Sequence, residues 1–276
     1  MASLQTPIVK VIRNVRRYIG ANAALFMIGA VGAAVFALLI TASADVYDDV
    51  ANSDGVSGLD RPVLEAAVSL RTPERERWVT AFTDLGTTTP MVFMGVSLTA
   101  ALYVHWRRRS IPLMMLIAAA GSTIFTSVGK TVVGRARPPL AMAVPPYEYA
   151  FSFPSGHTLN STVVALMLGY LAWWLSKNVW VRIICPALGA AWAAAMGCSR
   201  VYLGHHWLTD VMFGWVFGLA WLALLITTHQ ILLRLDRRDR RVLERGGHPD
   251  QPLSKSIEPD GGPDGADVKG AQVHNS

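Results

Sequence analysis

Charged residues are scarce in this sequence. Only 16% of the 276 residues are Asp, Glu, Lys or Arg, whereas a soluble domain carries roughly a quarter. The chain is 52% hydrophobic, its mean hydropathy is +0.34, and its apolar residues form long blocks instead of alternating at helical or strand spacing. These features argue against an ordinary soluble domain and predict an all-α, polytopic membrane protein.

Cysteine is also scarce. The two cysteines, Cys185 and Cys198, lie 13 residues apart in one predicted helix. Their separation along a helix is about 20 Å, too far for a disulfide. The net charge of +6 comes from basic clusters that lie beside the apolar blocks. Membrane topology explains such clusters, so we expect the lipid bilayer, and no nucleic acid, as a partner.

Six apolar segments are each near the length that a bilayer requires. In chain order they are 22–44, 79–104, 111–131, 157–175, 181–198 and 207–230. Asp84, Gly86 and Pro90 interrupt the start of the second segment. The apolar run before residues 42–44 is longer than that of a signal peptide, so we interpret the first segment as an uncleaved span.

Basic residues mark one side of these six spans. They cluster in the N-terminal segment, the second and fourth connections and the start of the tail: Lys10, Arg13, Arg16, Arg17, Arg107, Arg108, Arg109, Lys177, Arg182, Arg234, Arg237, Arg238, Arg240 and Arg241. By the positive-inside rule this side is cytoplasmic, so both termini are expected inside. The third and fifth connections then face outward, as does the first loop, 45–78, with eight acidic residues and four arginines.

The distribution of apolar segments and basic clusters divides the chain into three predicted parts. Residues 1–21 form a basic cytoplasmic segment, 22–233 the membrane domain, and 234–276 a cytoplasmic tail. Beyond Arg245 the tail is rich in Gly, Pro, Asp and Ser, and we expect it to be disordered.

The first loop contains a weak helical pattern. Asp60 is the expected N-cap and Pro62 lies in the first turn. The apolar residues at helical spacing are Leu59, Val63, Ala66, Ala67 and Leu70. The segment is either a short helix on the outer membrane surface or a solvated linker.

The outward third and fifth connections carry the chemistry-bearing residues. Lys130, Arg137 and Arg200 place three cations near one membrane face, without an equal number of acids in those loops. Unpaired cations at that depth favour a bound anion. Arginine offers a planar fork to phosphate oxygens and lysine a point charge. The sequence therefore predicts a phosphate site.

Two histidines complete this constellation. His206 and Asp210 are four residues apart at the start of the sixth span, so we expect them on one face of one helix. The carboxylate can then hold the imidazole in one tautomer for nucleophilic attack. His157 is a second imidazole that can protonate a leaving group. The free N–H groups of the helix start at Ser155 and Gly156 suit an anion. This is a phosphoryl-transfer site that needs no metal and no cofactor.

Three spaced motifs resemble a known signature. They are Lys-x6-Arg-Pro, Pro-Ser-Gly-His and Ser-Arg-x5-His-x3-Asp, within residues 130–210, and they are similar to those of the type-2 phosphatidic acid phosphatase superfamily, which is related to vanadium haloperoxidases. The resemblance implies a phosphohistidine on His206, oriented by Asp210, with His157 as general acid. It implies these phosphate ligands: Lys130, Arg137, Ser155, Gly156 and Arg200.

Other polar residues receive simpler interpretations. His205 lies about 100° around a helix from His206 and is expected to be structural, as are His105 and His229. Arg135 is either a headgroup contact or a surface charge. Glu148 is interpreted as a solvated loop residue.

The sequence therefore predicts a phosphatase that acts on lipids at the outer face of a bacterial plasma membrane. Several other functions compete with this prediction. A transporter would place its charges nearer the midplane, and a metal or haem site would suffer repulsion from the arginines. Ser155 and His157 point apart, which disfavours a Ser–His hydrolase, and haloperoxidases are soluble. A lipid phosphotransferase with the same site stays open. Among substrates, polyprenyl pyrophosphate ranks slightly before phosphatidylglycerol phosphate and phosphatidic acid, and the oligomeric state is not indicated.

Overall fold

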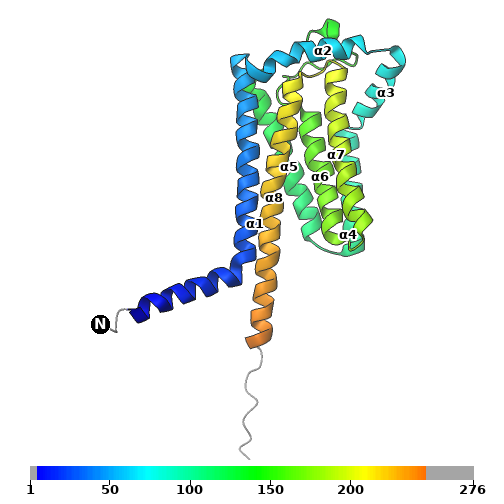
Figure 1. The fold of residues 1–276 in the computed structure, drawn as a ribbon. Helices are drawn as coiled ribbons and strands as arrows, with labels where there is room; N and C mark the ends of the chain where they lie inside the picture. The colour runs from blue at the N-terminus through cyan, green and yellow to red at the C-terminus, as the bar shows by residue number, and fades with distance from the viewer. Residues whose placement is uncertain (1–4, 247–276) are drawn as a thin grey trace, which may run out of the picture. The chain divides into compact units, whose positions relative to one another are not determined.

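The computed structural model of the chain describes residues 5–246, with side chains for residues 23–237. Within this part all regular elements are helical and no β-strand occurs, which confirms the predicted all-α class (Figure 1). The elements are α1 (Gln5–Asn52), η1 (Gly55–Leu59), α2 (Asp60–Ser69), α3 (Pro73–Asp84), α4 (Thr88–Trp106), α5 (Ser110–Val133), η2 (Leu140–Met142), α6 (Gly156–Leu175), α7 (Val179–Tyr202) and α8 (Leu208–Gly246).

Five helices in this part of the chain are long and apolar enough to cross a membrane. They are the Ala23–Asn52 part of α1, all of α5, α6 and α7, and the Leu208–Arg237 part of α8. Helices α3 and α4 meet the same test together, although they are bent by 55° at the break between them. The chain therefore has five candidate spans, or six if the bent pair crosses as one.

The break between α3 and α4 falls inside the predicted second span, 79–104. Pro90 lies in the first turn of α4, where its missing N–H leaves no hydrogen bond unmade. Gly86 lies in the break against α7, and a Cβ there would be 2.6 Å from the Sδ atom of Met196. The chain turns at this point because proline begins a helix more easily than it continues one.

Helix α6 forms the centre of the bundle and packs closely on α7. A Cβ at Gly169 would lie 2.8 Å from the Cα of Pro186, and one at Gly189 would lie 2.7 Å from the carbonyl oxygen of Ala165. Glycine at both positions lets the two backbones approach. On its other side α6 joins a buried apolar cluster with α5 and α8, which includes Ile111, Met115, Leu159, Met167, Leu171 and Leu222.

Helix α2, from the first loop, runs across one end of the bundle (Figure 1). Asp60 is not the N-cap that the sequence predicts, because α2 starts at Asp60 and Leu59 precedes it. Its carboxylate instead accepts hydrogen bonds from the backbone N–H of Thr209, at 2.9 Å, and from the Thr209 hydroxyl, at 2.8 Å. Arg71, just after α2, donates to the Tyr202 carbonyl at 2.7 Å. These bonds attach α2 to the ends of α7 and α8.

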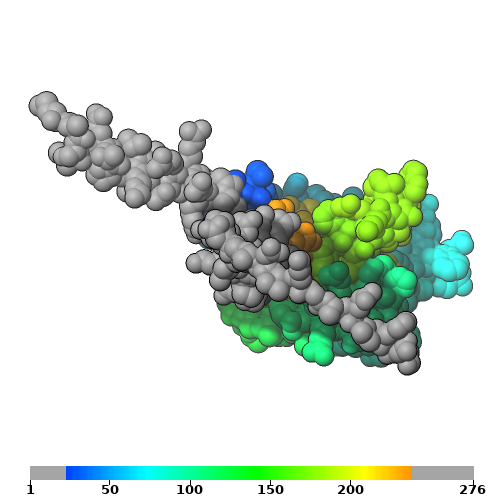
Figure 2. Space-filling model, turned by 90° about the horizontal axis from the view of Figure 1, so that it is seen from below, coloured from blue at the N-terminus to red at the C-terminus, as the bar shows by residue number. Residues whose placement is uncertain are grey.

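The α4–α5 and α6–α7 connections lie at the opposite end of the bundle (Figures 1 and 2). There the guanidinium of Arg108 lies 5.2 Å from the ring centre of Trp174. Helix α8 continues to Gly246, so residues 234–246, which the sequence assigns to the tail, are helical. Their Leu, Arg and Glu residues favour continuation of the helix. The rest of the predicted tail, 247–276, lies outside the described residues.

Candidate active site

The residues predicted for the site come from four helix ends at the end of the bundle that α2 crosses (Figure 1). The C-terminal ends of α5 and α7, the starts of α6 and α8, the loop after α5 and the turn before α8 contribute them. The eight residues are Lys130, Arg137, Ser155, Gly156, His157, Arg200, His206 and Asp210.

The His206–Asp210 pair is buried, with the two side chains 1% and 0% exposed. Nδ1 of His206 lies 3.3 Å from Oδ2 of Asp210. The same oxygen accepts hydrogen bonds from the Trp207 backbone N–H, at 3.0 Å, and from the Ser152 hydroxyl. Asp210 therefore holds the Nδ1 edge of the imidazole, and Nε2 lies on the opposite side of the ring.

His206 does not lie on the same helix as Asp210, contrary to the sequence interpretation, because α8 begins only at Leu208. The backbone N–H groups of His205 and His206 both donate to the Arg200 carbonyl, at 3.0 and 3.2 Å. Gly204 makes this turn possible, since its φ is +70° and a Cβ would lie 2.2 Å from the Met142 carbonyl oxygen. The pair is therefore formed by a turn between helices.

The Nε2 atom of His206 lies 3.1 Å from Nη1 of Arg137. Burial lowers the pKa of His206 well below its usual value, and the positive charges of Arg137 and Arg200 lower it further. The imidazole is therefore neutral at physiological pH. Because a guanidinium N–H can only donate, the Nε2 lone pair accepts a hydrogen bond from Arg137 here, and it becomes the nucleophile when a phosphoryl group replaces that contact.

Arg137 is held by backbone carbonyls. Its Nε donates to the Ala150 carbonyl at 2.6 Å, and its Nη1 donates to the His205 carbonyl at 2.5 Å. His205 is itself fixed, because its Nε2 lies 2.7 Å from the Val144 carbonyl oxygen. The structural role expected of His205 agrees with these contacts.

Glu148 is not the solvated loop residue that the sequence suggests. Its Oε2 lies 2.8 Å from Nη2 of Arg137, and its Oε1 pairs with Nη2 of the almost fully buried Arg200. Burial by itself raises the pKa of Glu148, but Arg200 and Arg137 outweigh it and hold that pKa at about 2. The carboxylate is therefore ionised and lies among the predicted phosphate ligands. Glu148 follows Arg137 by 11 residues, and a separation of this length in a loop does not predict an ion pair.

The start of α6 lies beside these cations. The Ser155 side chain caps α6, accepting hydrogen bonds from the Thr158 hydroxyl at 2.9 Å and from its backbone N–H at 3.5 Å. The Ser155 N–H donates to the Asp210 carbonyl at 3.2 Å, which joins this cap to α8. A Cβ at Gly156 would be 3.0 Å from Thr126, so glycine here also serves the packing of α6 on α5. Lys130 donates to the Phe151 carbonyl.

Two buried nitrogen atoms of the site have no hydrogen-bond partner within the described part of the chain. They are Nε2 of His157 and Nε of Arg200. A buried polar atom without a partner is destabilising. Both atoms are therefore suited to a ligand that brings oxygen atoms into the site.

Arg135 is neither a surface charge nor free to contact a headgroup. Its Nη1 lies 2.7 Å from Oδ1 of Asp210, and its Nη2 lies 2.6 Å from Oδ2 of Asp60. It is therefore a supporting residue of the His206–Asp210 pair. Sequence reasoning missed this role because Asp60 lies 75 residues before Arg135.

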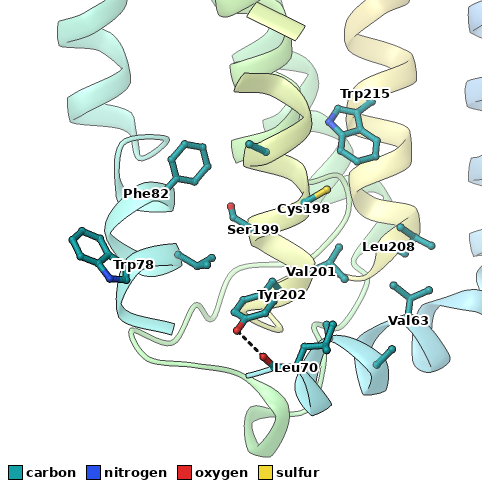
Figure 3. A pocket seen from close by; sticks show the side chains of 14 residues that line it. Val63, Leu70, Trp78, Phe82, Cys198, Ser199, Val201, Tyr202, Leu208 and Trp215 are labelled. Atoms are coloured by element: carbon teal, nitrogen blue, oxygen red, sulfur yellow. Dashed lines mark hydrogen bonds between the residues drawn. The ribbon is translucent and has the colours of Figure 1, made fainter. Parts of the chain in front are cut away.

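An apolar cavity of about 670 Å³ lies between α2, α3, α7 and α8 (Figure 3). Its lining includes Val63, Leu70, Trp78, Phe82, Tyr202 and Trp215. Ser199 also lines it, and its hydroxyl donates to the Thr83 hydroxyl, which also accepts a hydrogen bond from Nη1 of Arg200. The cavity therefore adjoins the charged cluster from the side of α3 and α7.

Comparison with known proteins relates this arrangement to a family. Residues 111–234 match the model of the PAP2 superfamily. The chain is 32% identical over 173 residues to phosphatidylglycerophosphatase B of Bacillus subtilis, covering 61% of this chain and 82% of that protein. It is 31% identical over 141 residues to undecaprenyl-diphosphatase of Sulfolobus acidocaldarius, covering 48% of this chain and 62% of that protein.

A solved structure agrees with these sequence matches. The transmembrane PAP2-type phosphatidylglycerolphosphate phosphatase from Bacillus subtilis superposes with a TM-score of 0.62 at 25% identity, covering 72% of this chain and 96% of that chain. The family match, 111–234, contains all eight predicted site residues. The chain therefore belongs to the PAP2 superfamily.

Proposed function

We propose that this PAP2-type lipid phosphatase removes phosphate from a membrane lipid through a phosphohistidine on His206, without a metal ion or cofactor. The observation that carries the proposal is the two-sided environment of His206. Asp210 lies 3.3 Å from its Nδ1, and Nη1 of Arg137 lies 3.1 Å from its Nε2. One nitrogen is thus oriented by a carboxylate, and the other faces a cation that suits a phosphoryl group.

The reaction proceeds in two displacements. Nε2 of His206 attacks phosphorus, and the N–P bond forms as the P–O bond to the lipid breaks. His157 donates a proton to the leaving oxygen. Water then attacks the phosphohistidine, His157 takes a proton from that water, and the N–P bond breaks to release inorganic phosphate. Asp210 stabilises the positive charge on the phosphorylated imidazole.

The phosphate ligands are Lys130, Arg137, Arg200 and the α6 start at Ser155 and Gly156. The three cations supply the positive charge that metal ions supply in other phosphoryl-transfer sites. Because carbonyl groups orient Arg137, its guanidinium is in place before phosphate arrives. Such preorganisation reduces the reorganisation needed in the transition state.

The site faces away from the cytoplasm in this proposal, and both termini are cytoplasmic. The α4–α5 connection carries Arg107, Arg108 and Arg109, and the α6–α7 segment carries Lys177 and Arg182. Both connections lie at the end of the bundle opposite the site (Figure 1). Since short basic connections stay in the cytoplasm, the site is on the outer side of six spans, with α3 and α4 forming the second.

The substrate is a lipid phosphomonoester or diphosphate. The apolar cavity beside Arg200 offers a surface on which a lipid chain can lie near the phosphate ligands (Figure 3). We rank polyprenyl diphosphate slightly before phosphatidylglycerol phosphate and phosphatidic acid. The relative from Sulfolobus acidocaldarius is named for the first of these lipid classes, and the relative from Bacillus subtilis for the second. A lipid phosphotransferase would use the same site but pass the phosphoryl group to an alcohol in place of water.

Phosphate release from the three lipids by purified full-length protein tests the proposal. We expect His206→Ala to abolish release and wild type to acquire an acid-labile, alkali-stable label from radioactive substrate. His105→Ala, at an exposed histidine on α4, is the matched control. Activity should persist in EDTA and be inhibited by vanadate. Normal turnover in His206→Ala, or a strict need for Mg²⁺, would reject this mechanism, and label transferred to an added alcohol would indicate a phosphotransferase.

A further inference from the structure

Glu148 lies where an incoming phosphate would meet the two arginines. It is the only acidic residue between Gly134 and Ser155. Its carboxylate bridges Nη2 of Arg137, at 2.8 Å, and Nη2 of Arg200. Its Oε1 also lies 3.8 Å from Nδ1 of His205. A single internal anion thus joins the two guanidinium groups assigned to phosphate.

The bonds of the arginines show which donors a phosphate can use. The Nε and Nη1 atoms of Arg137 are committed to backbone carbonyls, and Nη1 of Arg200 donates to the Thr83 hydroxyl at 3.1 Å. In both residues the Nη2 atom is paired with Glu148. Nε of Arg200 has no partner within the described residues, but Nη2 is the donor of Arg137 that is not bonded to a carbonyl, so a phosphate bound across the pair competes with this carboxylate. The phosphate and the Glu148 carboxylate repel each other, so they cannot both stay bonded to the same Nη2 atoms.

The environment of Glu148 allows the carboxylate to leave. Its side chain is 31% exposed, whereas that of Arg200 is only 1% exposed. Its neighbours Tyr147 and Tyr149 are exposed, the latter by 84%. Glu148 can therefore swing toward solvent without opening the packed core, while the arginines stay in place.

We propose that Glu148 is an internal competitor of the substrate phosphate, which pairs with Arg137 and Arg200 in the empty enzyme and returns to them when phosphate leaves. The inference rests on the proposed function, because it takes both arginines as phosphate ligands. Three cations would otherwise retain the inorganic phosphate product. The carboxylate weakens phosphate binding and thereby favours product release.

If Glu148 only positioned the arginines, its removal would change phosphate affinity in the opposite direction. If the carboxylate only orients the arginines, its removal loosens them and weakens phosphate binding. If it competes, its removal leaves both Nη2 donors free and strengthens phosphate binding. The inhibition constant for inorganic phosphate therefore separates the two roles.

The test compares Glu148→Gln with wild type in the purified full-length protein. We expect the inhibition constants of inorganic phosphate and orthovanadate to fall by about tenfold or more, since a charged hydrogen-bonding competitor is removed. The KM for lipid should fall as well, and kcat should not rise. Glu65→Gln is the matched control, because it removes the same charge from an exposed pair with Arg61. It should leave all constants unchanged.

Unchanged or higher inhibition constants in Glu148→Gln would overturn the inference, and a lower kcat/KM beside them would indicate a positioning role. If Glu148→Gln does not fold, Glu148→Asp provides the test, because its side chain keeps the charge but is one methylene shorter, which withdraws the carboxylate from the two guanidinium groups. Tighter phosphate inhibition in Glu148→Asp supports competition, and equal or weaker inhibition rejects it.

Arg137→Gln separates this inference from the proposed function. If Arg137→Gln leaves turnover and phosphate inhibition unchanged, the assignment of phosphate ligands fails, and the role of Glu148 fails with it. If Arg137→Gln weakens both while Glu148→Gln leaves phosphate inhibition unchanged, only the role of Glu148 fails.

Discussion

Asp60 and Asp210 share the guanidinium group of Arg135, at 2.6 Å from Nη2 and 2.7 Å from Nη1. Asp60 begins α2, and Asp210 lies in the first turn of α8. The helix that crosses the end of the bundle is thereby connected to the carboxylate beside His206. We infer that Arg135 positions Asp210 and does not contact phosphate.

Lysine substitutions at Arg135 and Arg137 should have different kinetic effects. In Arg135→Lys one ammonium cannot bridge Asp60 and Asp210, so kcat should fall about tenfold, a barrier increase of about 1.4 kcal/mol, with KM nearly unchanged. In Arg137→Lys the loss of a phosphate ligand should raise KM. Steady-state kinetics on one lipid measure both. A raised KM with normal kcat in Arg135→Lys would mean that Arg135 contacts substrate after all.

The protonation of His206 gives a second prediction. An ordinary histidine titrates with a pKa of about 6.5, whereas burial and the charges of Arg137 and Arg200 lower that of His206. Its neutral form, required for attack, should therefore persist as the pH falls below about 6.5. NMR of imidazole-labelled protein, with His206→Asn to assign the signal, should show no titration between about pH 7.5 and 6. A midpoint within that range would contradict the lowered pKa.

Membrane orientation can be tested by cysteine labelling in intact cells. Cys185 and Cys198 are first replaced by alanine, and single cysteines are then placed at Ala141 or Lys177, both of which are exposed. We expect an impermeant maleimide to label Ala141→Cys in intact cells and Lys177→Cys only after lysis. The activity of each variant shows that it is folded. Reversed labelling would place the site in the cytoplasm.

The contact between α6 and α7 predicts a difference between two glycine substitutions. Gly189→Ala places a methyl group 2.7 Å from the Ala165 carbonyl oxygen and should destabilise the protein by about 1–3 kcal/mol. Gly95→Ala is the control, since its Cβ would meet Val164 at 3.5 Å, an ordinary contact, and helix propensity then favours alanine. Thermal unfolding in detergent measures both. Equal stability of the two variants would show that α6 and α7 can separate at no cost.

The sequence alone determined the features that depend on short segments. Apolar blocks of bilayer length predict the membrane helices because the backbone must satisfy its own hydrogen bonds in lipid. Pro90 and Gly86 indicated the interruption in the second block for a local reason, the inability of proline to continue a helix. Arg200, His206 and Asp210 are likewise close in sequence, between the end of α7 and the first turn of α8. The motif Ser-Arg-x5-His-x3-Asp could therefore identify them together.

Only the tertiary structure decided which charges pair. Glu148 and Arg200 are 52 residues apart, and Asp60 and Arg135 are 75 apart. No local spacing relates such residues, because their contact depends on how α2, α6, α7 and α8 pack. For the same reason the sequence left Arg135 and Glu148 as ordinary charges, although one supports Asp210 and the other bridges two arginines. Electrostatic energy depends on distance in space, and helix packing determines that distance.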